Sequence, residues 1–478
     1  MSLTGKIAWN AAVQMSGKIL STVLGLVVIG MVTRALGPEL FGRYAIALAF
    51  LQVFSVLVDM GLYIVLVKKL SEDEAHSDDW ASAAFTLRLI TAVGFLIIAP
   101  LVGLLTHYPG DIKMGIAIAT ISTLAITLNQ LVVGAFQKVL RMDKVMVAEL
   151  AGRVVLIIST IFVARLHPTV PWIMMTVAAS SVTMFFLDLL FSRRFIRFRI
   201  RLDRPRMLAI LRETWPIALS IGFNLVYFKA DTLILAAVRP SSVVGLYGSA
   251  YKVLEVLAAF PAMFAGLLTP ILASTFAAGD FGRFRSVLQK AVTNLALFAL
   301  PLAVGTGFVA QQVMRLVGGP EYAGAAPALT LLMIATAAIF FGNLFANTVV
   351  AVNAQRKMLW GYAAVAVGSL IGYLISIPRF GMTGAATMTI ISEVAITLAA
   401  AWVVWRATRV RVNLIPAVRI LIACLPMAVL LGLTPHLALV WRLLLAVAGY
   451  TLGLILMRSF PTEILRELFS RFSYARQR

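Results

Sequence analysis

Charged and amide side chains recur inside the apolar segments of this sequence, at spacings that bring them onto one face of a helix. In the first segment Asn10, Gln14 and Lys18 are four residues apart, so two amides and an ammonium group share a face. Ionisable groups cost roughly 3 kcal/mol or more each near the centre of a membrane, and they normally face a cavity or one another. The spacing therefore predicts either a polar passage or a buried ion pair.

The acidic residues follow the same rule. Asp59 lies in the next segment at a depth similar to that of Lys18, so these two residues can pair. Asp231 shares a helical face with Asn224. Lys229 points roughly opposite to Asp231, so only one of those two charges easily faces a central lumen. Each of these charged groups can either form a structural ion pair or contact a transported molecule, and the sequence does not decide between the two roles.

Two further pairs have the spacing of ion pairs within one helix. Lys252 and Glu255 are three residues apart, and Glu149 precedes Arg153 by four, which brings opposite charges together. Glu393 has no basic residue near it in the sequence. Because polar faces recur in at least six segments across both halves, they argue for a shared polar cavity and hence for a transporter.

Nucleotide and metal chemistry have no support in the sequence. It contains no GxxxxGK[ST] phosphate loop and no HExxH motif, its one cysteine is Cys424, and its four histidines are scattered. We therefore expect no cofactor and no metal. Energy must come from a proton or sodium gradient, from the membrane potential, or from consumption of the product.

The elements that carry these residues must be membrane-spanning helices. The chain is 61% apolar and only 13% charged, with a mean hydropathy of +0.95, whereas soluble proteins are about 25% charged. Its apolar runs are long enough to cross a bilayer. The fourteen predicted spans are residues 9–36, 41–67, 80–106, 114–136, 145–165, 170–192, 214–238, 243–277, 287–317, 325–352, 358–378, 382–407, 414–433 and 437–458.

Lysine and arginine fall mainly on one side of these spans. With the N-terminus in the cytoplasm, 29 of the 41 basic residues are cytoplasmic and eight lie on the other side, as the positive-inside rule requires. This asymmetry accounts for the net charge of +21 without nucleic acid as a partner. We predict a multi-pass protein with both termini in the cytoplasm.

The two halves resemble each other. Residues 42–47 and 245–250 match in Gly, Tyr and Ala at a constant offset of 203, and each stretch begins the second span of its half. Six spans per half preserve orientation, so the predicted all-α fold has two six-helix lobes related by a parallel pseudo-two-fold axis, plus two C-terminal helices. The predicted domains are an N-lobe (1–192), a basic cytoplasmic linker (193–213), a C-lobe (214–410) and the last two helices with a basic tail (411–478). The linker forms either an ordinary positive loop or a short amphipathic helix on the anionic leaflet.

Three short motifs resemble those of a known family. The segments Leu36–Ala45, Asp59–Leu62 and Ile377–Ala386 are similar to motifs of the Wzx-type polysaccharide flippases. These flippases belong to the multidrug/oligosaccharidyl-lipid/polysaccharide exporter superfamily. The likeness covers nearly the whole chain, and it implies two lobes around a central cavity that opens alternately to either side of the membrane.

The resemblance also implies a cargo. Such a flippase moves undecaprenyl-pyrophosphate-linked oligosaccharide from the inner to the outer leaflet of the bacterial inner membrane, for O-antigen (lipopolysaccharide), capsule or exopolysaccharide assembly. It is not an enzyme. Sugar hydroxyls each cost several kcal/mol to strip of water unpaired, so a polar groove is required. The expected partners are membrane lipids, the polysaccharide polymerase and the chain-length machinery, and the chain itself is expected to be a monomer.

Pyrophosphate requires cations, and ion coupling requires carboxylates. The candidate cargo-binding residues are Lys18, Arg34, Arg88, Arg153, Lys229, Lys252, Asn10, Gln14 and Asn224. The candidate coupling residues for a proton or sodium ion are Asp59, Asp231, Glu255 and Glu393.

Other functions are compatible with the same composition. A multidrug cation antiporter of the superfamily shares the lobes but usually has twelve spans, so the two extra spans and the Leu36–Ala45 motif count against it. A peptidoglycan lipid-precursor flippase also has fourteen spans and stays open. A membrane glycan polymerase or ligase resembles proteins with a large outer loop that bears catalytic arginines, and no outer loop here exceeds about a dozen residues.

Overall fold

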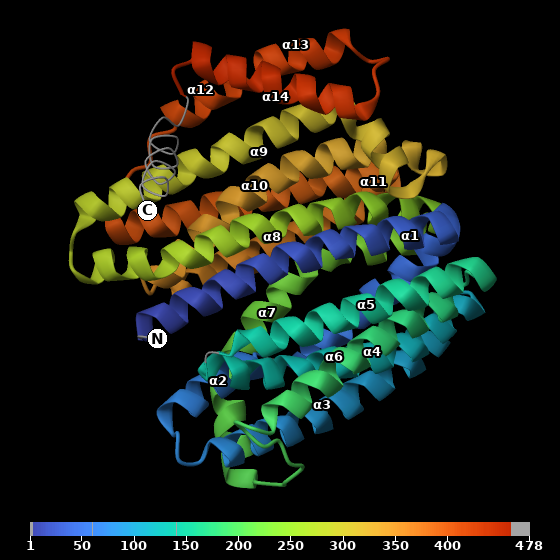
Figure 1. Cartoon of the computed structure of the whole chain (residues 1–478), viewed down its shortest axis with the longest axis vertical. Helices are drawn as coiled ribbons and strands as arrows, with labels where there is room; N and C mark the ends of the chain where they lie inside the picture. Colours follow the sequence, from blue (N-terminus) through green and yellow to red (C-terminus); the bar gives the residue numbers. More distant parts are fainter. Residues whose placement is uncertain (1–2, 60, 140, 460–478) are drawn as a thin grey trace, which may run out of the picture. The chain divides into compact units, whose positions relative to one another are not determined.

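The computed structural model of the chain describes residues 3–59, 61–139 and 141–459; in 3–16, 18–19, 56, 216–217 and 219–229 it describes the backbone alone. All regular elements in these ranges are helices (Figure 1). They are α1 (Leu3–Asp59), α2 (Leu62–Glu72), α3 (Ser77–Leu105), α4 (Gly110–Lys138), α5 (Met142–Leu166), α6 (Val170–Ser192), α7 (Arg204–Val238), α8 (Ser241–Ala277), α9 (Phe281–Gly318), the 3₁₀ helix η1 (Pro320–Ala325), α10 (Ala326–Ala351), α11 (Gln355–Thr408), α12 (Ile415–Ala423), α13 (Leu425–Leu433) and α14 (Leu439–Leu456).

Eleven helical segments of the described chain are long and apolar enough to cross a membrane. Two of them, Leu20–Glu72 with 53 residues and Gln355–Thr408 with 54, are more than twice the length that a bilayer requires. Each contains a glycine with non-helical angles, Gly37 at φ 66° and Gly381 at φ 59°, so each is a pair of spans. With α7 added, each of the fourteen predicted segments lies mainly in helix over its described residues, and the predicted all-α polytopic fold is confirmed.

Glycine makes the turns between several successive spans. Gly37 and Gly319 have φ values of 66° and 96°, and each is followed by Pro-Glu. Glycine adopts positive φ at little cost, and proline in the first turn favours the start of the next helix. Gly381, with φ 59°, makes a third turn of positive φ, and no proline follows it. The motifs Leu36–Ala45 and Ile377–Ala386, which carried the family resemblance, therefore contain inter-span turns.

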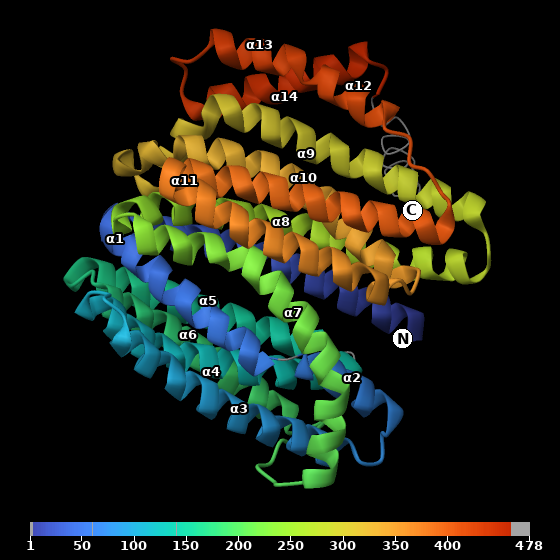
Figure 2. The ribbon, with the colours of Figure 1, turned by 180° about the vertical axis from the view of Figure 1, so that it is seen from behind.

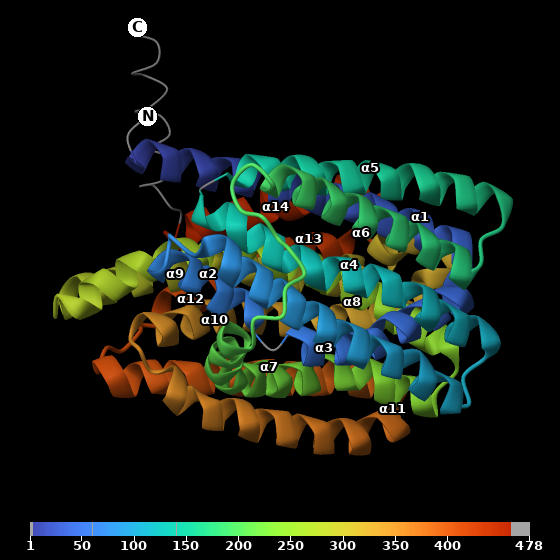
Figure 3. The same ribbon diagram turned by 90° about the horizontal axis from the view of Figure 1, so that it is seen from below.

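The chain divides into two compact units, the first of which comprises residues 1–256, 314–328 and 359–392. In this unit α3, α4, α5 and α6 run alongside one another (Figures 1 and 3). At one end of the unit the fully buried Leu66 and Ile210, from α2 and α7, belong to one apolar core. Because α2 and α7 share this core, their positions along each other are fixed, and so are the positions of the polar residues that they carry.

The second unit comprises residues 257–313, 329–358 and 393–478. In it α12, α13 and α14 lie beside α9 (Figure 2). Arg442 of α14 is 5% exposed and donates hydrogen bonds to the Gln312 side chain of α9 and to the Leu431 carbonyl of α13, at 3.0 and 2.9 Å. The boundary between the units passes through α8, α9, α10 and α11, and the domain limits derived from the sequence stay a prediction.

The basic linker is anchored to α3. Its residues 196–201 have no regular structure, yet the backbone N–H groups of Arg199 and Arg201 donate to the hydroxyls of Ser82 and Thr86, at 3.1 and 2.9 Å. These bonds satisfy donors that no neighbouring strand pairs with. The linker is therefore held by specific contacts along α3.

The amphipathic part of the linker, residues 207–211, belongs to the first turns of α7. Asp203 caps this helix by accepting a hydrogen bond from the Arg206 backbone N–H, and the helix then runs without interruption to Val238. Ile210 is fully buried. The apolar residues of this stretch thus belong to a helix of 35 residues, and they do not form a separate short helix.

The acidic loop between α2 and α3 is stabilised by its own hydrogen bonds. Asp73 accepts a bond from the Trp80 indole N–H at 3.0 Å and lies 3.0 Å from Nδ1 of His76. These partners, the indole first, hold the pKa of Asp73 below its ordinary value. The carboxylate is therefore the form that the folded loop prefers.

Candidate functional site

The two glycine-tyrosine stretches that match in the sequence contact each other. A Cβ added to Gly42 of α1 would lie 1.7 Å from the carbonyl oxygen of Ser241, and one added to Gly245 of α8 would lie 1.9 Å from that of Pro38. Only glycine permits so close an approach of two backbones. The second part of α1 begins just before Gly42, after the turn at Gly37, and α8 begins at Ser241. This glycine contact therefore joins the start of the second part of α1 to the start of α8, on the side that the charge distribution predicts to be the outer one.

A small cavity lies next to the glycine contact, between α1, α7 and α8. Its volume is about 40 Å³, which is room for a few waters at most. Its polar lining comes from Tyr44, Gln52, Thr232, Tyr251, Lys252 and Glu255. The structure thus brings two of the predicted site residues, Lys252 and Glu255, to one polar cavity.

The two charges at this cavity neutralise each other. Lys252 Nζ lies 2.6 Å from Glu255 Oε2, and both side chains are about one-third exposed, 31% and 32%. The spacing of three residues on α8 predicted this pair. Any other anion at this ammonium group would compete with the Glu255 carboxylate.

Asp231 lies behind the cavity in a network of hydroxyl groups. It is 1% exposed, and its Oδ2 accepts a hydrogen bond from the Tyr247 hydroxyl at 2.5 Å. Tyr247 lies 3.5 Å from the hydroxyl of Thr389, which lies 3.4 Å from that of Tyr373. The network links α7, α8 and α11. Sequence reasoning noticed Tyr247 only as a repeat position, because nothing in the sequence showed that it faces Asp231.

Arg88, which is buried, forms an ion pair with the partly exposed Asp59 where α1 ends. The Arg88 side chain is fully buried, and its Nη2 lies 2.6 Å from Asp59 Oδ1. Its Nη1 donates to the Val58 carbonyl at 3.0 Å. A candidate cargo-binding residue and a candidate coupling residue are therefore held by each other, between α3 and the end of α1. Lys18, the partner considered for Asp59, lies outside the described side chains.

A hydroxyl of α1 connects the predicted pair on α5. Ser21 Oγ donates to Glu149 Oε1 at 2.5 Å and accepts from Arg153 Nε at 3.1 Å. The two charged groups therefore meet through a serine. Their hydrogen bonds tie α5 to the first part of α1.

A buried acid that sequence reasoning missed lies on α6. Asp188 has no exposed surface, and neither carboxylate oxygen makes a hydrogen bond to a described residue. The Asn129 side chain of α4 is near enough to support this carboxylate, and Glu149 of α5 is near enough to repel it. A carboxylate so poorly supplied with donors is costly inside a membrane. This position is therefore chemically suited to take up a proton or a cation.

Two other candidate residues, Arg34 and Glu393, do not line the cavity beside Lys252. Arg34 donates to the Leu316 carbonyl at 2.6 Å and ties α1 to the end of α9. Glu393 of α11 is 4% exposed, and its carboxyl has no ion-pair or hydrogen-bond partner within the described chain. The candidates whose side chains lie outside the description are Asn10, Gln14, Lys18, Asn224 and Lys229. In the described part, no group of three or more His, Cys, Asp or Glu could hold a metal ion.

Comparison with solved structures identifies the fold. The lipid II flippase MurJ in an inward-closed conformation has a TM-score of 0.77 at 15% identity, over 93% of this chain and 98% of that one. An inward-facing multidrug resistance MATE family transporter of the MOP superfamily has a TM-score of 0.68 at 16% identity, over 84% of this chain and 98% of that one. An outward-facing MATE family transporter gives 0.63 at 17% identity, over 85% and 96%. Identities this low establish the fold alone.

Comparison with protein families identifies the family. The MatE family profile matches residues 216–378. No curated protein sequence gives a significant match. The profile described as polysaccharide biosynthesis protein matches residues 7–276, more than half of the 478 residues. The chain therefore belongs to the polysaccharide biosynthesis protein family.

Proposed function

We propose that this protein flips undecaprenyl-pyrophosphate-linked oligosaccharide from the inner to the outer leaflet of a bacterial inner membrane, for O-antigen, capsule or exopolysaccharide assembly. The observation that carries the proposal is the family match over residues 7–276. A sugar head group crosses a bilayer only if its hydroxyls remain paired. Polar side chains within apolar helices supply such partners.

The cavity beside Lys252 supports a route for the head group. At about 40 Å³ it admits water but no sugar, so transport requires α1 and α8 to separate. We assign the glycine contact between these helices the role of an outer gate. When the gate opens, a cargo phosphate replaces the Glu255 carboxylate at Lys252, exchanging one anion for another.

Carboxylates inside the helices are the proposed sites of ion coupling. To the four residues expected from the sequence the structure adds Asp188, which is buried and makes no hydrogen bond to a described residue. Proton uptake there removes the cost of a buried anion. The membrane potential adds to the driving force, because moving two negative charges outward gains about 4.6 kcal/mol per 100 mV.

The test is lipid-linked oligosaccharide analysis in a deletion strain. We expect intermediates to accumulate on the inner leaflet, and we expect the wild-type gene to remove them. Lys252→Ala should complement at least about tenfold less well, since it removes a charge-assisted contact. Arg212→Ala, which removes an exposed cation on α7, is the matched control and should complement fully. Normal appearance of intermediates on the outer leaflet of the deletion strain would refute the proposal.

A peptidoglycan lipid-precursor flippase is the second candidate. It is favoured by the similarity in fold to the lipid II flippase MurJ. In that case deletion should be lethal, and depletion should accumulate lipid II in place of an oligosaccharide lipid. A multidrug antiporter, suggested by the MatE match over residues 216–378, predicts drug sensitivity of the deletion strain with unchanged lipid intermediates.

A further inference from the structure

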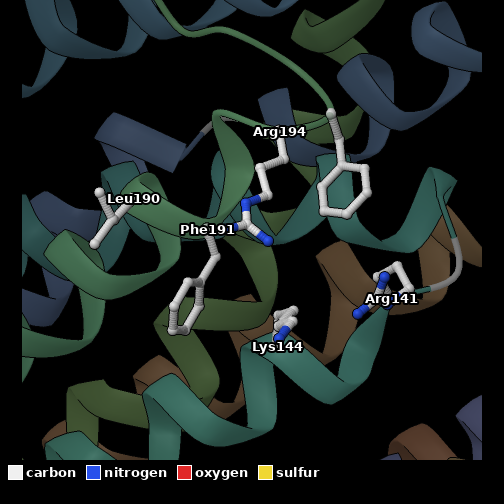
Figure 4. A pocket seen from close by; sticks show the side chains of 6 residues that line it. Arg141, Lys144, Leu190, Phe191 and Arg194 are labelled. Carbon is white, nitrogen blue, oxygen red and sulfur yellow. The ribbon is translucent and has the colours of Figure 1, made fainter.

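A basic pocket lies apart from the cavity beside Lys252, where α5 begins and α6 ends. Its volume is about 400 Å³, and its walls are Arg141, Lys144, Leu190, Phe191, Arg194 and Phe195. Figure 4 shows the nitrogen atoms of Arg141, Lys144 and Arg194 facing a common space. These cations come from the turn before α5, from α5 itself and from the residues after α6. Three segments thus converge on one basic pocket.

The pocket carries more positive charge than its own acid neutralises. Arg141 is held by Asp143 through two bonds, Nε to Oδ1 at 2.9 Å and Nη2 to Oδ2 at 3.0 Å. Lys144 and Arg194 form no ion pair with any residue that the structure describes. One acid against three cations leaves a net charge of two positive units. Such a site attracts a phosphate group.

The apolar residues of the lining indicate which class of phosphate compound the pocket can bind. Lys144 Nζ lies 5.5 Å from the centre of the Phe191 ring, and Arg141 Cζ lies 5.6 Å from that of Phe195. Leu190 is 43% exposed and Phe195 is 38% exposed. Partly exposed apolar groups directly beside cations are complementary to a ligand that is anionic at one point and apolar next to it. A phospholipid has this character, and inorganic phosphate does not.

A second pocket repeats this composition nearby. It has a volume of about 350 Å³ and is lined by Leu189, Arg193, Arg197, Phe198 and Arg199. Both pockets lie at the end of α6 that the charge distribution assigns to the cytoplasm, where the leaflet carries anionic lipids. We propose that the pocket of Arg141, Lys144 and Arg194 binds the phosphate head group of an anionic phospholipid from the cytoplasmic leaflet. This inference rests on the predicted orientation and is independent of the transported cargo.

The test is photocrosslinking of the full-length protein in vesicles. One vesicle type contains phosphatidylglycerol with a diazirine near its head group, and the other contains phosphatidylcholine labelled in the same way. The readout is the crosslink yield at residues 190–195. We expect phosphatidylglycerol to label this segment at least about tenfold more than phosphatidylcholine does. The reason is that Lys144 and Arg194, which no described acid neutralises, each favour an anionic head group. Equal labelling by the two lipids would overturn the proposal.

Matched variants separate the pocket from general surface charge. Lys144→Ala/Arg194→Ala should lower the phosphatidylglycerol yield about tenfold to thirtyfold, since it removes two cations near the head group. Lys144→Arg/Arg194→Lys, which keeps the charge, should restore most of the yield and guards against misfolding. Arg212→Ala/Arg285→Ala removes the same charge from exposed positions and should leave the yield unchanged. Unchanged labelling of the Lys144→Ala/Arg194→Ala protein would contradict a specific binding site. An equal loss of labelling in the Arg212→Ala/Arg285→Ala protein would contradict it too.

A competition experiment tests which phosphate source occupies the pocket. Inorganic pyrophosphate is added to the phosphatidylglycerol vesicles at the concentration of the labelled lipid. We expect no loss of labelling, because pyrophosphate makes no contact with the apolar walls. Complete displacement would show that the pocket takes a free phosphate, and it would overturn the assignment to a lipid.

Discussion

The contact between Gly42 and Gly245 allows one prediction to be worked out from distances. In Gly42→Ala the new Cβ would lie 1.7 Å from the Ser241 carbonyl oxygen, whereas real Cβ atoms essentially never approach within 3.0 Å. The helices must therefore separate by at least 1.3 Å, the difference between these two distances. The obstacle is backbone on a neighbouring helix, so no side-chain rotation relieves it. Overpacking of this kind costs about 1–3 kcal/mol, and occasionally more.

Two control variants make the prediction specific. Gly94→Ala places a Cβ on α3 where no atom lies within 4 Å, and a helical Gly→Ala change should be neutral or stabilising by up to about 1 kcal/mol. Gly245→Ala should cost about as much as Gly42→Ala, because its Cβ meets the Pro38 carbonyl oxygen at 1.9 Å. The double variant Gly42→Ala/Gly245→Ala should cost less than the sum, since one separation of the helices accommodates both methyl groups.

The assay is the melting temperature of the purified protein in detergent, followed by size-exclusion chromatography after heating. We expect both single variants to melt below the wild type and Gly94→Ala to melt at or above it. Transport should also fall, because the proposed gate at the contact between α1 and α8 no longer closes. A Gly42→Ala protein as stable and as active as the Gly94→Ala protein would refute the close backbone contact and the gate assigned to it.

Further predictions concern buried and acidic groups. Arg88→Ala leaves Asp59 without its cation and should destabilise the protein by about 3 kcal/mol, while Arg88→Ala/Asp59→Ala should recover part of that loss in the same melting assay. Tyr247→Phe removes a donor from buried Asp231 and should cost about 1–3 kcal/mol; unchanged melting would contradict the network. The pKa of Asp73 is lowered in the folded loop, so its stabilisation is complete above about pH 4 and is lost as pH falls through the folded-state pKa. Melting temperatures measured from pH 7 to pH 3 should therefore decline more steeply in the wild type than in Asp73→Asn, and the two curves should converge at low pH.

Much of the fold follows from chain length and apolar content, because each span needs only enough apolar residues to cross the bilayer. The pair of Lys252 and Glu255 was predictable for a similar reason, since residues three apart on one helix are neighbours. The repeat of Gly42 and Gly245 was also visible in the sequence. That these two glycines contact each other was not, because a shared offset shows equivalence and carries no information about proximity.

What the sequence left unpredicted at the candidate site depends on which helices lie next to each other. Depth along a helix suggested Lys18 as a partner for Asp59, and that contact stays a prediction because the Lys18 side chain lies outside the description; among the described residues Asp59 pairs with Arg88. Depth does not reveal which helix lies alongside, and here α1 ends directly against α3. Asp188 was missed because it is a single polar residue in its part of an apolar run, and so it makes no stripe. A lone acid in a predicted span was the available signal.

The most direct measurement of the central claim is transport by the purified protein in proteoliposomes. A lipid-linked oligosaccharide is placed in the inner leaflet, and its arrival in the outer leaflet is followed by oxidation of its sugars with a membrane-impermeant reagent. The account predicts that the wild-type protein makes the sugar accessible within minutes, and that Gly42→Ala and Lys252→Ala proteins do so much more slowly. Sugars that stay protected as long in wild-type vesicles as in protein-free vesicles would contradict it.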